Sequence, residues 1–84
     1  MLKKSKIVFP RYGHFETRLK TYKIDYTSSS IIFKFDDDFA KAGFFHTGID
    51  DETICYYCGG GLKDWGDEDD PWEAHAQYFR RCPY

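Results

Sequence analysis

The sequence has no long apolar run and only three cysteines, and each shortage excludes a class of protein. A membrane-spanning helix needs about 20 mostly apolar residues, and no such stretch is present. The basic first residues look like the start of a signal peptide, but no apolar segment follows them. An odd cysteine number would leave one thiol unpaired in a disulfide framework. We therefore expect a protein without a membrane partner, in a reducing compartment, the cytoplasm or nucleus.

The chain is also short, so its own hydrophobic core should be weak. A chain of 84 residues makes one domain and buries only about 60–65% of the surface of its unfolded form. Aromatic residues are frequent, at 20% of the sequence. Some of them must remain on the surface, where they mark contact patches.

The net charge of −2 is unevenly divided along the chain. Residues 1–23 carry seven Lys or Arg and one acid, which leaves 12 − 7 = 5 basic and 14 − 1 = 13 acidic residues in the remainder. An acidic domain is a poor partner for a phosphate backbone, so we expect no nucleic acid. Residues 1–13 are read as a flexible basic lead-in and residues 14–84 as the folded domain.

The three cysteines and one histidine share the spacing Cys55-x2-Cys58-x16-His75-x6-Cys82. Three thiolates and an imidazole make the closed tetrahedral ligand set of a structural Zn²⁺ site, and this set uses every thiol in the chain. Such a zinc can contribute on the order of 10 kcal/mol to folding. Since protein fills all four positions, no metal-bound water remains to be activated, and we do not expect an enzyme.

The pattern of apolar and turn residues predicts a small α+β fold. A helix is expected over residues 14–23 because Phe15, Leu19 and Tyr22 share one face. Residues 31–33 could be a short strand or a buried turn. A further helix is expected at 39–42, with N-cap carboxylates at 36–38 and Gly43 as its stop.

Three tightly joined strands, at residues 44–47, 53–57 and 61–65, predict an antiparallel meander. The last helix should begin at Asp70 as N-cap, with Pro71 and Glu73 in its first turn. His75 falls on this helix and Cys82 follows its end. The metal should therefore fasten the helix to the strands.

Several segments together resemble the BIR domain, the baculoviral repeat of the inhibitor-of-apoptosis (IAP) proteins. They are Arg18-Leu-Lys-Thr-Tyr22, Ala42-Gly-Phe-Phe-His-Thr-Gly48, Cys55-x-x-Cys-Gly-Gly-Gly-Leu-x-x-Trp65, Asp70-Pro-Trp-Glu-x-His75 and Cys82. The likeness covers residues 15–84. It implies a three-stranded sheet flanked by short helices, one zinc on the four ligands above, and a structural role for Arg18.

The resemblance is to the BIR domains that carry a peptide groove. It implies binding of free N-termini beginning with Ala, on IAP antagonists and processed caspases, and thereby suppression of cell death. The expected groove residues are Gly61, Leu62, Lys63, Trp65, Asp69, Tyr78 and Phe79.

The residues suggest how such a groove would bind its ligand. A peptide would add to the edge of strand 61–65, with main-chain contacts from Lys63. Asp69 would receive the α-ammonium, and Leu62 and Trp65 would enclose a small side chain. Tyr78 and Phe79 would form an aromatic wall for a proline at the third peptide position.

The chain departs from groove-bearing relatives at Ala74, where Gln or Glu is usual, and at Tyr78, where Trp is common. We expect Trp72 in the core, and Trp65 fits either groove or core. The main alternative is a scaffold BIR domain that binds an adaptor or another copy of itself and leaves the groove unused. A monomeric domain is favoured over that self-association.

Overall fold

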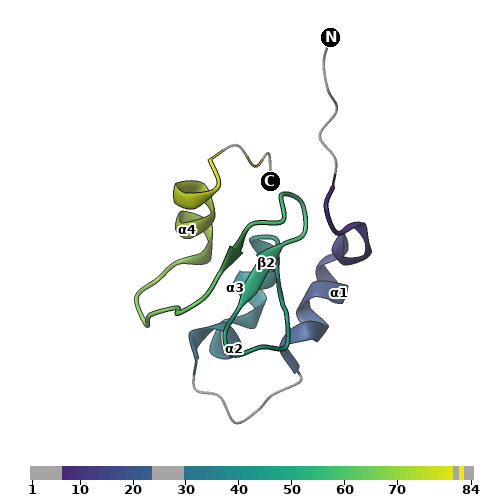
Figure 1. Ribbon diagram of the computed structural model, residues 1–84. Helices are drawn as coiled ribbons and strands as arrows, with labels where there is room; N and C mark the ends of the chain where they lie inside the picture. Colours follow the sequence, from purple (N-terminus) through teal and green to yellow (C-terminus); the bar gives the residue numbers. More distant parts are fainter. Residues whose placement is uncertain (1–6, 24–29, 81, 83–84) are drawn as a thin grey trace.

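The computed structural model describes residues 7–23, 30–80 and 82, which form four short α-helices, two 3-10 helices and three strands. In order they are η1 (Pro10–Tyr12), α1 (Phe15–Lys20), η2 (Thr21–Lys23), α2 (Ile31–Lys34), α3 (Asp36–Lys41), β1 (Phe44–His46), β2 (Thr53–Cys55), β3 (Gly61–Leu62) and α4 (Pro71–Tyr78). Figure 1 shows α1 and α4 on opposite sides of the sheet. No helix in the described ranges is long and apolar enough to cross a membrane.

The sheet is antiparallel with strand order β1-β2-β3, as predicted from the sequence. Its third strand is shorter than expected, because β3 ends at Leu62 and not at Trp65. Asp64 has a φ of 61°, in the left-handed region that an extended strand cannot use. The N–H groups of Asp64 and Trp65 donate to the carboxylate of Asp51 and take no part in the ladder.

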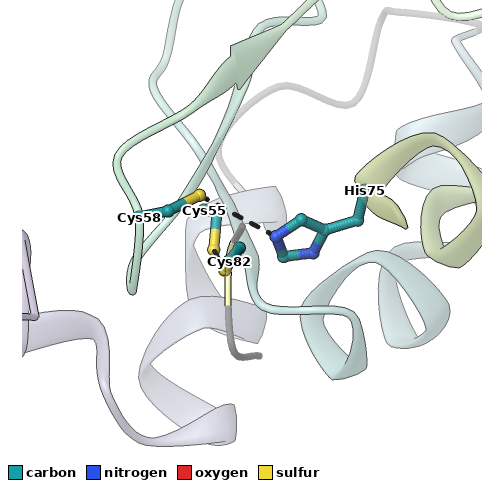
Figure 2. A group of neighbouring side chains, drawn as sticks. All are labelled: Cys55, Cys58, His75 and Cys82. Atoms are coloured by element: carbon teal, nitrogen blue, oxygen red, sulfur yellow. Dashed lines mark hydrogen bonds between the residues drawn. The ribbon is translucent and has the colours of Figure 1, made fainter. Parts of the chain in front are cut away.

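The hydrophobic core lies between the sheet and the helices that precede it. Its buried members are Tyr22, Ile31, Ile32, Phe39, Ala40, Ala42, Phe44 and Cys55. Phe39 and Phe44 are fully buried, and both rings meet the ring of Trp65 edge-on, with centroids 4.7 and 5.8 Å away. Cys55 belongs to this core and also faces Cys58, His75 and Cys82 (Figure 2). The core and the cysteine–histidine cluster are therefore continuous.

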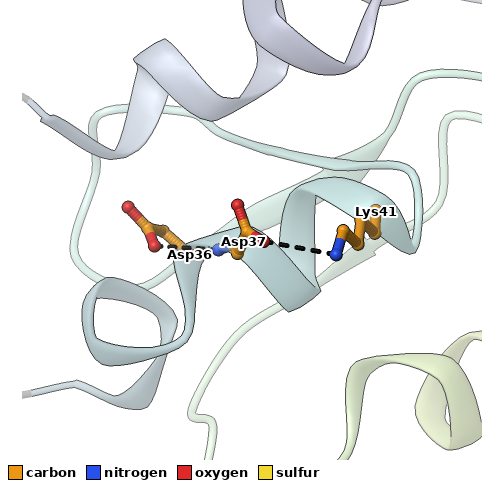
Figure 3. Close-up of polar contacts among 3 residues, drawn as sticks. All are labelled: Asp36, Asp37 and Lys41. Atoms are coloured by element: carbon orange, nitrogen blue, oxygen red, sulfur yellow. Dashed lines mark hydrogen bonds and ion pairs between the residues drawn. The ribbon is translucent and has the colours of Figure 1, made fainter.

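Residues 31–41 form two consecutive helices, so the strand considered for residues 31–33 is absent. Ser30 caps α2 by accepting a hydrogen bond from the N–H of Ile32 at 3.4 Å. In α3 the three aspartates lie in the first turn, and the N-cap position is Phe35 rather than an acid. Figure 3 shows the exposed Asp37–Lys41 pair along α3, 3.3 Å apart. Exposed pairs of this spacing contribute only about 0.3–0.5 kcal/mol.

Arg18 on α1 ties three segments of the chain together from a buried position. Its Nε donates to the carbonyl of Ala40 at 2.8 Å, and Nη1 donates to the carbonyls of Tyr12 and Gly13 at 3.0 and 3.1 Å. The guanidinium carbon also lies 4.7 Å from the centroid of the Tyr56 ring. Helices α1 and α3 and the segment before α1 are thus joined through one planar, multi-donor group.

Part of the segment expected to be a flexible lead-in packs against the folded domain. Residues 1–6 lie outside the described residues, but Val8 and Phe9 donate backbone hydrogen bonds to Tyr57 and Tyr56. Tyr12, in η1, stacks on Phe45 with ring centroids 4.0 Å apart. Val8, Phe9 and Tyr12 thus contact β1 or the turn after β2.

Candidate functional site: a metal centre beside an acidic groove

The four predicted metal ligands come together at one point. Cys55 ends β2, Cys58 lies in the turn that follows, His75 is on α4 and Cys82 comes after that helix (Figure 2). Their ligand atoms all lie within 4.8 Å of one another. The Sγ atoms of Cys55 and Cys82 are 3.8 Å apart, and a tetrahedron with Zn–S bonds of about 2.3 Å places two sulfurs about 3.8 Å apart. The donor set and its spacing fit Zn²⁺.

The turn that carries Cys58 needs the glycines that follow this cysteine. Gly59 has a φ of 78°, and its N–H donates to the carbonyl of Cys55 at 2.9 Å. A Cβ atom on Gly60 would collide with the ring of Phe79. The turn can therefore curl around the metal and still be covered by the end of α4.

His75 is oriented by a backbone carbonyl. Its Nδ1 lies 2.9 Å from the carbonyl oxygen of Ala42, which can only accept, so Nδ1 carries the proton. Nε2 is then the nitrogen with the free lone pair, and it lies 3.9 Å from Sγ of Cys58. Burial lowers the pKa of His75, against the raising effect of the Ala42 bond. A neutral, correctly oriented imidazole is what metal coordination requires.

Burial also controls the protonation of Cys55. It raises the pKa of this thiol to about 12 in the absence of a metal ion, mainly by desolvation of the thiolate. A bound zinc must therefore displace a proton from Cys55, and its positive charge then compensates the buried thiolate.

A cavity of about 210 Å³ lies next to the metal centre, between the end of β3, the loop after it and α4. It is lined by Leu62, Lys63, Asp64, Trp65, Glu68, Asp69, Asp70, Glu73, Ala74, Gln77 and Tyr78. Five of the seven predicted groove residues are in this set. Gly61 lies on β3 just outside it, and Phe79 faces Gly60 and the His75 ring instead.

Acidic side chains dominate the lining of the cavity. Five carboxylates stand against a single lysine, Lys63. Sequence reasoning did not assign Asp64, Asp70 or Gln77 to the groove. The signal for Gln77 was its spacing from Glu73, because residues four apart share a helix face. The excess of carboxylates around the cavity favours a positively charged ligand.

Asp69 also shapes the loop in which it stands. Its Oδ2 accepts a hydrogen bond from the N–H of Gly66 at 2.7 Å, and the N–H of Asp69 donates to the carbonyl of Gly66 at 3.1 Å. The carboxylate therefore closes a turn and at the same time lines the cavity.

The exposure to solvent differs among three ring side chains, those of Trp72, Tyr78 and His46. Trp72 was expected in the core, but it is 48% exposed in the first turn of α4, so that prediction is wrong. Tyr78 is 61% exposed at the rim of the cavity. His46 is buried and packs in β1, with Nε2 2.8 Å from the carbonyl oxygen of Asp50.

A hairpin fastened to a terminal helix by a Cys3His centre, with a groove beside it, defines a small zinc-stapled domain. The family model of the BIR, or Inhibitor of Apoptosis, domain matches residues 18–84. The chain therefore belongs to the BIR domain family. BIR domains bind zinc, and Cys55, Cys58, His75 and Cys82 are grouped in this chain so that they could hold it.

Individual relatives agree with this assignment. The chain is 44% identical over 75 residues to "Apoptosis inhibitor IAP" of Cydia pomonella granulosis virus, covering 89% of this chain and 26% of that protein. It is 41% identical over 76 residues to "Baculoviral IAP repeat-containing protein 7" of Mus musculus, covering 90% and 26%. The chain thus spans about a quarter of the length of these relatives.

The fold is also similar to a solved structure, that of DIAP1 BIR1 bound to a Grim peptide. The TM-score is 0.73 at 28% sequence identity, and the match covers 86% of this chain and 70% of that one.

Proposed function

We propose that this domain is a binding module for free protein N-termini of the Ala-x-Pro-x type, carried by IAP antagonists and processed caspases, and that it suppresses cell death by engaging them. The observation that carries the proposal is the acidic cavity beside β3. The Grim peptide bound by DIAP1 BIR1, a structure with the same fold, supports it.

The charge of the cavity suits an α-ammonium group. Five carboxylates and one lysine surround it, and a carboxylate that receives a cationic amine makes a stronger hydrogen bond than a neutral acceptor does. Asp69 and Glu73 are the candidates for that contact, because one stands on the loop before α4 and the other on its first turn.

The size of the cavity suits a small first side chain. Leu62 and Trp65 contribute its apolar part, and the Trp65 ring is fixed by Phe39 and Phe44 behind it. Close packing behind the ring leaves little room for a longer side chain, which would have to displace the core. A methyl group is accommodated without such a displacement.

Groups at the rim of the cavity can contact the next residues of the peptide. The exposed edge of β3 offers backbone groups for strand addition, and Tyr78, exposed at the opposite rim, offers a ring face for proline. A proline in the ligand lowers the entropy cost of holding it extended.

Ala74 lines the cavity without a polar group. A second hydrogen bond to the ligand amine is thus missing at this position, which lowers the binding energy by about 1 kcal/mol. Gln77, on the same helix, also lines the cavity and carries a neutral polar group that could take its place.

The test is a titration of the zinc-loaded domain with an Ala-x-Pro-x peptide and with the same peptide acetylated at its amine. We expect binding of the free-amine form only. Equal binding of both forms, or binding of neither, would refute the proposal and favour the scaffold role, in which an adaptor or second copy binds elsewhere.

A further inference from the structure

We infer that Asp51, which lies outside the groove, is a positioning residue for peptide recognition, a role that rests on the proposed function. Its carboxylate accepts two backbone hydrogen bonds from the groove segment. Oδ1 lies 2.9 Å from the N atom of Asp64, and Oδ2 lies 2.8 Å from that of Trp65. One side chain from the β1–β2 loop thereby fixes the backbone on which two cavity-lining residues stand.

The segment held in this way would not be stable by local preference. Asp64 has a φ of 61°, a conformation that costs a non-glycine residue about 1 kcal/mol or more. It lies two residues after the end of β3, where ladder pairing with β2 has already stopped. A bidentate carboxylate offsets this cost, because hydrogen bonds to a charged acceptor are the stronger kind.

Asp51 is itself held in place by its loop. The N–H of Thr47 donates to the carbonyl of Glu52 at 3.2 Å, and the N–H of Glu52 donates to the carbonyl of Ile49 at 3.0 Å. The hydroxyl of Thr47 also donates to Oε1 of Glu52 at 3.1 Å. The carbonyl of Asp50 lies 2.8 Å from Nε2 of the buried His46. The carboxylate is therefore carried by a turn that these hydrogen bonds hold on both sides of it.

The consequence for the groove is twofold. The backbone of Trp65 is placed by Asp51 while its ring is placed by Phe39 and Phe44, so the small-side-chain pocket exists in the free domain. The N–H groups of Asp64 and Trp65 are also already used, so a peptide that adds to β3 cannot accept hydrogen bonds from these two residues. Loss of Asp51 would leave the ligand to order this segment, which weakens binding.

Asp51→Asn is the decisive variant, because it keeps the shape and replaces one of two acceptor oxygens by a donor. The new amide NH2 group would face a backbone N–H that donated to the carboxylate before. One hydrogen bond is therefore lost, and two donor groups face each other. The matched control is Asp50→Asn, which removes the same charge from the neighbouring position. Asp50 is exposed at a φ of 48°, which asparagine tolerates.

Two measurements on the zinc-loaded domain test the inference. The first is the affinity for the free-amine Ala-x-Pro-x peptide, which should fall at least about tenfold in Asp51→Asn and stay near wild type in Asp50→Asn. The second is amide hydrogen exchange without peptide. The amides of Asp64 and Trp65 should be protected in the wild type and in Asp50→Asn, and should exchange faster in Asp51→Asn, while chelator-sensitive cooperative melting persists.

The outcomes separate this inference from the proposed function. Normal peptide affinity in Asp51→Asn would overturn the positioning role and leave the proposed function intact. Unprotected Asp64 and Trp65 amides in the wild type would also overturn it, even if the variant does not fold. A wild type that binds no free-amine peptide would sink the proposed function and, with it, any role of Asp51 in binding.

Discussion

The Nδ1 atom of His75 lies 2.9 Å from the carbonyl oxygen of Ala42, so the end of α3 orients a metal ligand carried by α4. Ala42 is fully buried in the core. We therefore expect the core and the zinc site to form together, and neither to persist without the other.

Removal of zinc is expected to unfold the domain. A small core leaves little stability of its own, and a structural zinc contributes on the order of 10 kcal/mol. A chelator should abolish the cooperative thermal melt followed by far-UV circular dichroism, and added zinc should restore it. A spectrum that does not respond to chelation would contradict the zinc assignment.

Zinc affinity should rise with pH. The pKa of the Cys55 thiol is raised to about 12, so this group is protonated at neutral pH and must release a proton on binding. Release of the Cys55 proton alone makes the affinity increase at least about tenfold per pH unit between about pH 7 and 8. The pKa of His75 is lowered by burial, so its imidazole is already neutral above its ordinary pKa and adds no slope there. Competition with a chromophoric chelator measures this, and a pH-independent affinity would refute it.

Replacing Arg18 by lysine should destabilise the domain despite conserving the charge. Lysine cannot reproduce the planar group that bonds Ala40, Tyr12 and Gly13. We expect a loss of about 3 kcal/mol in the free energy of unfolding, measured by denaturant titration. Arg11→Lys, at an exposed position, is the control and should change stability by less than about 0.5 kcal/mol. Equal stability of the two variants would show that Arg18 is dispensable.

Asp69→Asn should weaken the free-amine peptide by about tenfold. Asparagine can still accept the hydrogen bond from Gly66 through its amide oxygen, so the loop turn is retained while the charge is lost. Asp67→Asn, on the same loop but outside the cavity lining, is the charge-matched control. If both variants bind alike in calorimetry, Asp69 is not the amine receptor.

Ala74→Gln should strengthen the same peptide by roughly fivefold, since a side chain that lines the cavity would gain a hydrogen bond of about 1 kcal/mol. Ala76→Gln is the control, because Ala76 is exposed on α4 and does not line the cavity. If both variants gain peptide affinity, the gain is a general effect of the helix, and a hydrogen bond from position 74 does not explain it.

Much of this domain could be predicted from its sequence, because the informative signals are local. The zinc ligands follow from residue types and spacing, and the start of α4 follows from Asp70, whose carboxylate accepts from Trp72 and Glu73 as an N-cap does. The three strands follow from short apolar runs between turn residues. In each case the physical cause lies within a few residues of its effect.

The remaining features were decided by contacts between distant segments. Strand β3 ends at Leu62 because Asp51, more than ten residues earlier, accepts the hydrogen bonds of the Asp64 and Trp65 N–H groups. Phe79 lies beside the metal turn and not in the groove, because Gly60 leaves room for its ring. Val8 and Phe9 pair with the turn after β2, because Tyr57 and Tyr56 offer them backbone acceptors. The sequence thus determined the metal site and the elements around it, whereas the edges of the groove depend on tertiary packing, which no local pattern encodes.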